Sequence, residues 1–477
     1  MHPLELSAES LQKAIESAAR FVREEIDSLD TQPSADVDGA EELARTFLEE
    51  PPGGPQPLEA ILARLRPAIR KSFNTAGPGY LAFIPGGGIM SAAIAEFIAA
   101  SANRYVGVRA PAPALAQIEE TAIGWLARFM GYPETAGGIL TSGGSLSTLS
   151  AIVAARETCL PEDFSRGTLY ISEETHYCVP KAARIAGFRD WQIRRIAVDS
   201  RRRVDTRALA HAVEVDRMKG LKPFLIIANV GTTNTGAIDE IKKLLAIARR
   251  HSMWLHADAA YGGFFRLASG GPALMPDIEE CDSITLDPHK GMFLPYGTGC
   301  LLVLRKETLK RTHSMDAEYL HDVRATETSA NFSDISPELS RDFRGLRIWL
   351  PLVLHGVDAF KDAIEEKLAL TRWAYDRLAE DPRFEILDEP QLSVVAFRLK
   401  ADRAESDRIN EELMRRVNAR GRVFLSSTRL DGRYTIRLCV LSFRTHLDRV
   451  RDAILALKEE ADGILASPAE RAAEPGT

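Results

Sequence analysis

Residues 283–291 contain a lysine whose position could make it a nucleophile. The apolar run at residues 283–286 is followed by Asp287-Pro288-His289-Lys290-Gly291. A buried strand would therefore end in a polar turn that presents the amine of Lys290. Such an amine can form a Schiff base with a carbonyl cofactor such as pyridoxal phosphate. The alternative is a surface lysine in a loop, and this segment alone does not decide between the two.

An acid follows a second strand-like run, at residues 254–257. Residues 256–263 read HADAAYGG, so Asp258 stands where the run ends. A carboxylate at that place can keep a pyridine nitrogen protonated, because an adjacent negative charge raises the pKa of a cation. The alternative is an aspartate that caps the N-terminus of a helix.

A glycine-rich turn at residues 141–148, which read TSGGSLST, joins an apolar run to a helical pattern at residues 149–157. Gly143, Gly144 and Ser145 would offer free backbone N–H groups and a favourable helix dipole to a phosphate. No lysine follows as it would in a nucleotide-binding P-loop, and the spaced glycines of a dinucleotide site are missing. The turn alone is a weak indication of phosphate binding.

Two further polar segments follow strand-like runs. His176 lies in ETHY at residues 174–177, and Thr233 lies in NVGTT at residues 229–233. In an open α/β sheet, ligands bind outside the carboxyl ends of the strands. A phosphate loop, an imidazole, a threonine, an acid and a lysine therefore form one predicted site.

The elements that would position this site alternate along the chain. Strand-like runs alternate with helical patterns from about residue 86, which predicts an α/β fold with a parallel or mixed sheet covered on both faces. The runs are residues 168–171, 193–198, 224–228, 254–257, 283–286 and 299–304. An amphipathic helix is predicted at residues 8–30, and a long helical stretch at residues 346–379 precedes a smaller α+β region.

We therefore predict four parts. Residues 1–70 form an N-terminal helical segment, residues 71–355 a large domain, and residues 356–465 a small C-terminal α+β domain. The Ala/Glu/Pro-rich end, residues 466–477, is predicted to be disordered.

The composition is that of a soluble, mildly acidic globular protein. The 477 residues contain 60 Lys and Arg against 67 Asp and Glu, a net charge of −7, with 45% hydrophobic residues. A basic footprint is missing, so no nucleic-acid partner is expected. Apolar stretches such as residues 90–102 are shorter than the ~20 residues that cross a bilayer, so no membrane span is expected.

Cysteine usage and the start of the chain bear on the compartment. Five scattered cysteines without a Cys-x-x-Cys pair argue against a disulfide framework or a zinc site, and no metal is predicted. Residues 1–9 carry acids and lack the features of a secretory signal. We expect a cytoplasmic protein.

The order of these motifs resembles the fold-type I (aminotransferase-like) pyridoxal-phosphate enzymes. It is most similar to the group II amino-acid decarboxylases, which include the aromatic-L-amino-acid and glutamate decarboxylases. The motif at residues 258–261 (DAAY) together with Pro288-His289-Lys290 carries the resemblance most specifically. The likeness runs from the N-terminal helices to about residue 460.

The resemblance implies roles for single residues. Lys290 would carry pyridoxal 5'-phosphate as a Schiff base, and Asp258 would pair with its pyridine nitrogen. His176 would stack on one face of the ring and Ala260 would pack on the other, with Thr233 close to the ring substituents. Residues expected to hold the phosphate are Gly143, Gly144, Ser145 and His289.

Quaternary structure and a catalytic loop also follow from the resemblance. The family forms homodimers whose active sites lie at the interface, with N-terminal helices that clasp the other subunit. A mobile loop, here approximately residues 315–343, closes over the partner's site. The family's catalytic tyrosine in that loop falls on Phe332, which cannot donate a proton. Other proton donors to be considered are His176, Tyr319 and water.

Substrate contacts are expected from two segments. Phe83 and Pro85 lie in a stretch similar to the family's pocket entrance, and Tyr105 lies in a segment that replaces a bulkier aromatic wall. Arg109 could bind an acidic substrate side chain by a bidentate contact. It could equally form an interface salt bridge.

The predicted function is decarboxylation of an L-amino acid, with aromatic substrates favoured, through a Lys290 Schiff base and a quinonoid intermediate. Decarboxylation-dependent oxidative deamination to an aldehyde is the first alternative, and Phe332 is the residue that favours it. An aminotransferase or desulfurase is less compatible with Pro288-His289-Lys290. A non-catalytic protein on the same scaffold is disfavoured by Lys290, Asp258 and His176.

Overall fold

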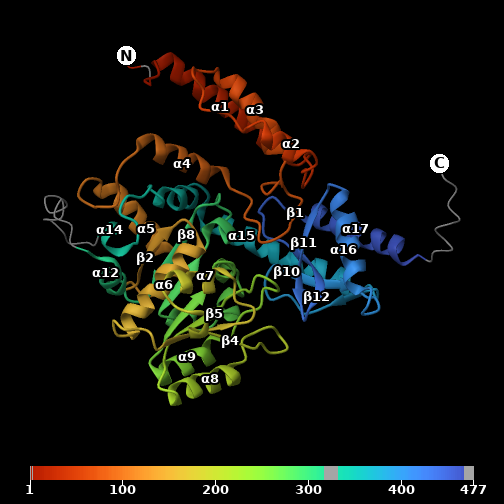
Figure 1. The fold of residues 1–477 in the computed structure, drawn as a ribbon. Helices are drawn as coiled ribbons and strands as arrows, with labels where there is room; N and C mark the ends of the chain where they lie inside the picture. The colour runs from red at the N-terminus through yellow and green to blue at the C-terminus, as the bar shows by residue number, and fades with distance from the viewer. Residues whose placement is uncertain (1, 3, 316–330, 467–477) are drawn as a thin grey trace. The chain divides into compact units, whose positions relative to one another are not determined.

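The structure, a computed structural model, describes residues 2, 4–315 and 331–466, and these separate into two compact units (Figure 1). The larger unit comprises Gly88–Tyr375 and Ile386–Ala396. The smaller unit comprises Met1–Gly87, Asp376–Glu385 and Phe397–Thr477, as far as they are described. Part of the predicted catalytic loop, residues 316–330 with Tyr319, and the predicted tail from residue 467 lie outside the described residues.

A seven-stranded sheet forms the centre of the larger unit, in the order β2-β8-β7-β6-β5-β3-β4. All neighbouring pairs are parallel except the two that include β8, which runs antiparallel to both β2 and β7. This confirms the predicted α/β class with a mixed, mostly parallel sheet. The strands are β2 (Gly137–Thr141), β3 (Gly167–Ser172), β4 (Ile193–Ile196), β5 (Lys222–Asn229), β6 (Trp254–Asp258), β7 (Ser283–Leu286) and β8 (Gly299–Val303).

Helices cover both faces of this sheet. Leu169 and Ile171 of β3 pack in one apolar cluster with α6 (Gly144–Cys159) and α7 (Cys178–Ile185). Between them, Tyr170 points to the other face, because successive strand residues alternate. Its hydroxyl donates a hydrogen bond of 2.7 Å to Asp216 of α8 (Thr206–Met218). Burial on both faces explains why the strands appear in the sequence as nearly continuous apolar runs.

The remaining helices of the larger unit surround this core. They are α4 (Met90–Ala102), α5 (Pro113–Phe129), α9 (Ile241–His251), α10 (Gly271–Leu274), α11 (Pro288–Gly291), α12 (Glu307–His313), α14 (Phe332–Ile335) and α15 (Gly345–Ala379), with short 3-10 helices at Asp190–Gln192, Gly263–Leu267 and Ile278–Glu280. The predicted boundary at residues 355 and 356 falls inside α15. There Gly356 has a φ of 75° and kinks the helix.

The smaller unit combines the two ends of the chain. Its N-terminal part contains α1 (Ala8–Ser28), α2 (Ala40–Arg45), α3 (Leu58–Arg70) and β1 (Tyr80–Leu81). Strand β1 pairs in parallel with β11 (Phe424–Leu430), in the five-stranded order β1-β11-β12-β10-β9. Its other elements are α16 (Ser406–Ala419), β12 (Arg433–Cys439) and α17 (Leu447–Leu465), while β9 (Phe384–Ile386) and β10 (Val394–Leu399) each have residues in both units.

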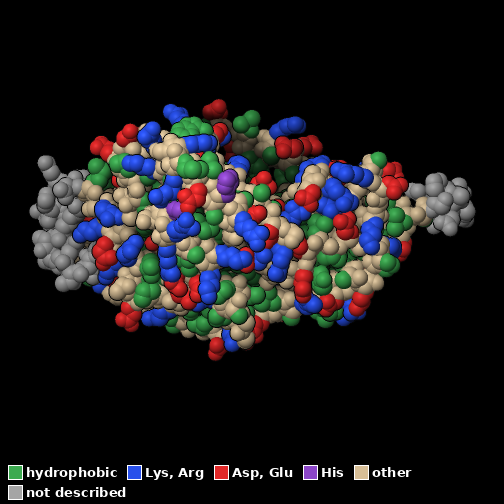
Figure 2. Space-filling model, turned by 90° about the horizontal axis from the view of Figure 1, so that it is seen from below, with side chains coloured by type: hydrophobic (Ala, Val, Ile, Leu, Met, Phe, Trp, Pro, Cys, Tyr) green, Lys and Arg blue, Asp and Glu red, His purple; other side chains and the backbone are tan. Residues whose placement is uncertain are grey.

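Surface charge and helix length both bear on whether the chain could span a membrane. On the face that Figure 2 shows, Lys and Arg side chains lie interspersed with Asp and Glu. Within residues 2, 4–315 and 331–466, no helix is both long and apolar enough to cross a membrane.

His256 of β6 is a fully buried titratable group that ties β6 to β7. Its Nδ1 lies 2.7 Å from the Ser283 hydroxyl and its Nε2 lies 3.2 Å from the Thr285 hydroxyl. Burial lowers the pKa of His256 to about 3. The imidazole is therefore neutral in the folded protein at neutral pH.

The first testable prediction concerns acid sensitivity. Below about pH 6.5 the unfolded chain protonates His256 while the folded chain does not, so stability present above that pH falls as the pH drops towards 3. The free energy of unfolding should lose about 1.4 kcal/mol per pH unit through this group. Urea unfolding at pH 7 to 4.5 should show a shallower loss in His256→Gln, with exposed His211→Gln as the control. Equal slopes for the wild type and His256→Gln would contradict the prediction.

Candidate active site

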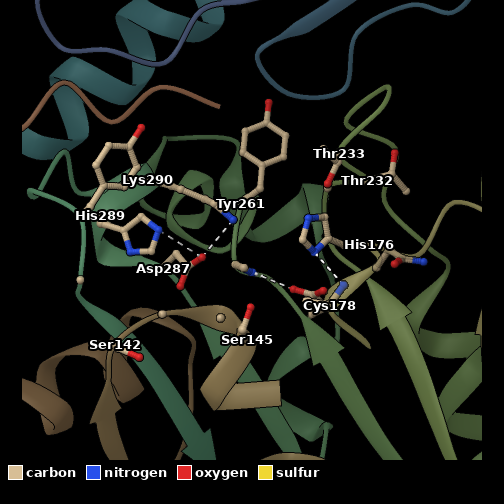
Figure 3. Close-up of a pocket in the computed structure, with 18 residues that line it drawn as sticks. Ser142, Ser145, His176, Cys178, Thr232, Thr233, Tyr261, Asp287, His289 and Lys290 are labelled. Atoms are coloured by element: carbon tan, nitrogen blue, oxygen red, sulfur yellow. Dashed lines mark hydrogen bonds and ion pairs between the residues drawn. The ribbon is translucent and has the colours of Figure 1, made fainter. Parts of the chain in front are cut away.

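A cavity of about 530 Å³ opens at the edge of the sheet where the parallel strands end (Figure 3). Segments that follow β2, β3, β5, β6 and β7 contribute to its walls, together with the segment that precedes β8. The cavity is lined by Ser142, Gly143, Gly144, Ser145, His176, Cys178, Asn229, Gly231, Thr232, Thr233, Asp258, Ala260, Tyr261, Asp287, His289, Lys290, Tyr296 and Gly297. The antiparallel direction of β8 places its preceding residues at this same edge.

Lys290 lies in α11, directly after β7, and its ammonium contacts an acid. Its Nζ lies 2.9 Å from Oδ2 of Asp287, as a dashed line in Figure 3 shows. Burial lowers the pKa of Lys290, but the charges of Asp287 and Asp258 and the hydrogen bond to Asp287 raise it above its ordinary value. The amine is therefore held as an ammonium while it is paired with Asp287.

Asp258 is the last residue of β6. Burial raises the pKa of its carboxyl, while Lys290, the Ala260 N–H and His176 lower it by smaller amounts. Oδ1 accepts a hydrogen bond of 3.3 Å from the backbone N–H of Ala260. A carboxyl in this setting is stabilised as an anion by a nearby cation, and a protonated ring nitrogen is such a partner.

His176 lies in the turn between β3 and α7. Its Nδ1 accepts a hydrogen bond of 3.3 Å from the backbone N–H of Cys178, which leaves the hydrogen of a neutral ring on Nε2. Burial lowers the pKa of His176, and Lys290 adds to that effect while Asp258 and Asp287 oppose it. The cavity therefore presents a flat, neutral imidazole.

The loop before α6 forms a close-fitting cradle. A Cβ on Gly144 would lie 3.1 Å from an oxygen of Asp287 and 3.4 Å from the Ala260 Cβ, and a Cβ on Gly299 would lie 2.5 Å from the Cα of Gly143. Glycine at residue 299 thus permits the loop to approach β8 closely. The first N–H groups of α6 have no partner within the helix, and an anion can accept from them.

These groups fit pyridoxal phosphate. The N-terminus of α6 and His289 suit the phosphate, the Asp258 carboxyl suits a ring nitrogen, and Lys290 suits an aldehyde. Side chains larger than glycine would fill the space beside the loop before α6. A cation next to the buried Asp258 carboxyl would stabilise its charged form. The same residues were predicted from the sequence to form one site, and the structure brings them together.

The predicted residues Phe332, Tyr105 and Arg109 do not line this cavity in the described chain. The Phe332 ring is 4% exposed and lies under the Arg341 guanidinium at 4.9 Å. The Tyr105 hydroxyl donates to the Leu339 carbonyl.

Arg109 and the predicted entrance residues have other surroundings. The Arg109 guanidinium donates to Glu120 at 2.9 Å and to Gln117 at 2.6 Å. Phe83 and Pro85 belong to the smaller unit, where the Phe83 side chain is 53% exposed and its N–H donates to Ser426. Their substrate roles stay predictions.

Sequence reasoning missed Asp287, Cys178, Tyr296 and Tyr261 as lining residues. Asp287 directly follows β7, a signal that was available but was assigned no role. Tyr296 was missed because it precedes a strand, and only the antiparallel direction of β8 places it at the ligand-binding edge. Tyr261 is held by its hydroxyl, which lies 2.8 Å from that of Ser393.

The fold and the site are those of a pyridoxal-phosphate enzyme. Comparisons with known proteins identify the family within that class. The family model described as "Pyridoxal-dependent decarboxylase conserved domain" matches residues 41–400. The chain belongs to this decarboxylase family, and its cofactor is pyridoxal phosphate. A crystal structure of Oryza sativa TDC with PLP and tryptamine is similar at a TM-score of 0.92 and 26% identity, covering 98% of this chain and 100% of that one.

Two relatives of similar sequence are named for different activities. An aromatic-L-amino-acid decarboxylase from Bacillus atrophaeus is 34% identical over 467 residues, 97% of each chain. A phenylacetaldehyde synthase from Arabidopsis thaliana is 27% identical over 441 residues, 89% of this chain and 90% of that protein. The predicted fold type and family are confirmed, and the residue roles remain proposals.

The second testable prediction concerns Lys290. Among the described residues that line the cavity, Lys290 is the only one whose side chain offers an amine to an aldehyde, and Lys290→Ala removes it. The variant should lose both turnover and the visible absorbance of lysine-bound cofactor. Absorbance spectra of Lys290→Ala and of the exposed control Lys243→Ala, each with added cofactor, check this. A retained lysine-type band in Lys290→Ala would refute the assignment.

Proposed function

We propose that the protein decarboxylates an L-amino acid with an aromatic side chain. The observation that carries the proposal is the placement of Lys290, between Asp287 and the strand that ends in Asp258, in a cavity with a phosphate cradle. Membership of the decarboxylase family supports the reaction type. The Bacillus atrophaeus relative, named for aromatic L-amino acids, supports the substrate class.

The chain's own residues prepare the site for this reaction. Pyridoxal phosphate, when bound, supplies an electron sink for the pair left behind as CO₂ departs. Gly143, Gly144 and Ser145 would hold its phosphate, and the Asp258 carboxylate would keep the ring nitrogen protonated. The substrate's amine would displace the Lys290 amine, and Lys290 would then take part in release of the product.

His176 and the surrounding wall would control protons and water. The neutral His176 ring offers a flat surface and one N–H donor, which can orient a substrate group or move a proton. Thr233 and Ala260 would contact the cofactor ring, as the family resemblance implies. Enclosure by these residues limits access of water to the reacting carbon.

The surroundings of Arg109 favour an aromatic substrate over an acidic one. Its guanidinium already binds the Glu120 carboxylate and the Gln117 amide oxygen. A bidentate contact to an acidic substrate would require both bonds to be replaced. Phe83, Pro85 and Tyr105 are the apolar contacts that we propose for an aromatic ring.

A second candidate function is decarboxylation coupled to oxidative deamination, which yields an aldehyde. Phe332 favours it, because a phenyl ring cannot return a proton to the substrate carbon. A relative named phenylacetaldehyde synthase, and so named for an aldehyde product, supports this candidate. In the described chain the Phe332 ring is packed under the Arg341 guanidinium.

A homodimer is proposed from apolar side chains that the larger unit leaves exposed. Helices α4 and α15 are joined by a 3.0 Å contact between the Ser91 hydroxyl and Nε2 of His355. Around this contact, side chains 40–65% exposed form an apolar surface that water disfavours. They are Ile94, Phe97, Ile98, Val353, Leu354 and Val357.

The N-terminal helices carry a similar surface on the smaller unit. Helices α1 and α3 are held together by polar contacts, including Ser17 to Glu59 at 3.0 Å and Arg66 to Glu24 at 2.6 Å. Their apolar side chains point outwards, each 39–48% exposed: Leu11, Ile15, Val22, Ile61, Leu65 and Ile69. We propose that they clasp the second subunit.

We also propose a cytoplasmic location. All five cysteines are unpaired, and four of them are buried. Unpaired thiols are typical of a reducing compartment.

The third testable prediction separates the two activities. Cofactor-loaded protein is incubated with a panel of aromatic and acidic L-amino acids, and CO₂, amine, aldehyde and peroxide are measured together. We expect CO₂ and amine in equal amounts from aromatic substrates only. Aldehyde with matching peroxide would establish the oxidative reaction instead, and Phe332→Tyr should then shift products towards amine. No CO₂ from any substrate would refute both.

The fourth testable prediction concerns assembly. Phe97→Glu with Leu354→Glu places two charges in the proposed interface, where their desolvation opposes association. Light scattering should show a dimer for the wild type and a shift to monomer for the variant. Met218→Glu, at a side chain 79% exposed in α8, is the matched control and should remain dimeric. A wild-type monomer, or a fully dimeric double variant, would contradict the proposal.

A further inference from the structure

Asp239 is a buried acid at the end of the loop that follows β5, residues 229–239, and it does not line the cavity. Its Oδ2 accepts hydrogen bonds from the backbone N–H of Asn229 at 2.7 Å and from Nδ2 of the Asn229 amide at 2.9 Å. Its Oδ1 accepts a third hydrogen bond, of 2.7 Å, from the Val204 N–H. One carboxylate therefore fixes both the backbone and the side chain of Asn229, which does line the cavity.

The charge of Asp239 decides which way the Asn229 amide faces. Burial raises the pKa of Asp239 to about 6, against the opposing effect of its N–H donors, so the carboxyl is an anion at neutral pH. An ionised carboxylate only accepts hydrogen bonds, so the end of the amide that faces it must be the NH₂ group. The same NH₂ group also donates to the Ser172 hydroxyl, at 3.0 Å.

Ser172 is the last residue of β3 and begins the turn that carries His176, residues 172–176. The Ser172 N–H donates to Oγ1 of Thr175 at 3.0 Å, and the Thr175 N–H donates to the Ser172 carbonyl oxygen at 3.2 Å. The two hydroxyl oxygens lie 3.2 Å apart. Both residues are buried, where hydrogen bonds are stronger than they are in water. The residue directly before His176 is therefore held by Ser172.

The His176 ring has little else to hold it. Its Nδ1 accepts one hydrogen bond, from the Cys178 N–H in α7, on the C-terminal side of the turn. On the N-terminal side, the place of the ring depends on the turn itself. The loop after β5 makes a second contact with this turn, from Nδ2 of Asn234 to Oε2 of Glu174 at 2.8 Å. The loop therefore holds the turn at two points.

We propose that Asp239 is a positioning residue, which acts through the Asn229 amide and the turn after β3 to fix the place of the His176 ring in the cavity. The hydrogen bonds run from Asp239 to Asn229, then to Ser172 and Thr175. Asp239 and Ser172 lie outside the cavity lining, so they reach His176 from behind the wall. The inference rests on the proposed place of His176 against the cofactor ring, and it is independent of which amino acid is the substrate.

A small displacement of His176 has consequences for the cofactor. Packing attraction between two flat rings depends steeply on their separation, and a gap of about 0.5–1 Å already loses a quarter to a half of it. The ring also presents one N–H donor, whose direction changes when the turn moves. The buried chain of hydrogen bonds thus controls both the packing surface and the donor that His176 offers.

The fifth testable prediction concerns the bound cofactor in the full-length protein, measured by its visible circular dichroism band and its dissociation constant. His176→Ala removes the ring and should weaken binding of pyridoxal phosphate by about 2- to 10-fold. Ser172→Ala and Thr175→Val each remove one hydroxyl of the turn. Each should reduce the dichroism band and weaken binding by at least about twofold, and by no more than His176→Ala does.

Two matched variants separate positioning from a general loss of stability. Thr175→Ser keeps the hydroxyl and should restore both measurements to the wild-type values. Thr168→Val removes another buried hydroxyl of β3, which lies 3.1 Å from the Tyr170 hydroxyl and away from the turn. It should leave the dichroism band and the dissociation constant unchanged.

Combined variants test whether the effects pass through His176. In a His176→Ala background, Ser172→Ala should have no further effect on either measurement, because the ring that it positions is gone. Asp239→Asn should weaken binding as Ser172→Ala does, and the two together should do no more than the stronger single change. If Asp239→Asn does not fold, Asn229→Leu, which removes the amide that Asp239 orients, takes its place in the same comparison.

Four results would overturn the inference. They are additive losses in the combined variants, unchanged measurements in Ser172→Ala and Thr175→Val, an equal change in Thr168→Val, and wild-type cofactor binding in His176→Ala. All four concern cofactor binding and leave decarboxylation by the wild type untouched. A wild type that binds the cofactor but releases no CO₂ from any amino acid would contradict the proposed function alone, so the two failures are distinguishable.

Discussion

An ammonium that is largely removed from water is stable only beside an opposite charge. The contact of 2.9 Å between Lys290 and Asp287 meets this requirement. It also sets the chemical problem of the site, because the same contact keeps the amine protonated. The surrounding groups hold this pair at the edge of the sheet and line the cavity beside it.

The order of strands in the sheet arranges those groups. From β2 to β3 the edge presents the glycine cradle, then Tyr296 before β8, then Asp287 and Lys290 after β7, then Asp258 on β6, and finally His176 after β3. Neighbouring strands lie about 4.8 Å apart, so this order spaces the glycine loop and Asp258 on opposite sides of Lys290. Close approach of the cradle to β8 depends on glycine at residue 299.

Contacts within the chain change which functions a side chain is available for, compared with what its residue type alone would indicate. Arg109 has the chemistry of a carboxylate receptor, but Glu120 and Gln117 occupy its guanidinium. Phe332 was predicted to fall at the family's catalytic tyrosine position, yet its ring is packed under Arg341. In both cases the residue type was evident from the sequence, and its availability was a matter of tertiary contacts.

The sequence by itself determined the α/β class, the six strand runs from residues 168 to 304, and the site that includes Lys290, Asp258 and His176. These follow from local properties, because apolar runs mark buried strands and parallel strands bring their carboxyl ends to one edge. Only the tertiary structure decided the antiparallel direction of β8, which brings Tyr296 to the site, and the pairing of β1 with β11, which joins the two ends of the chain in one unit. The bridge that Asp287 makes between Lys290 and His289 also belongs here. Strand direction and side-chain pairing depend on contacts between segments far apart in the chain or on the local turn, and hydrophobic periodicity carries no record of either.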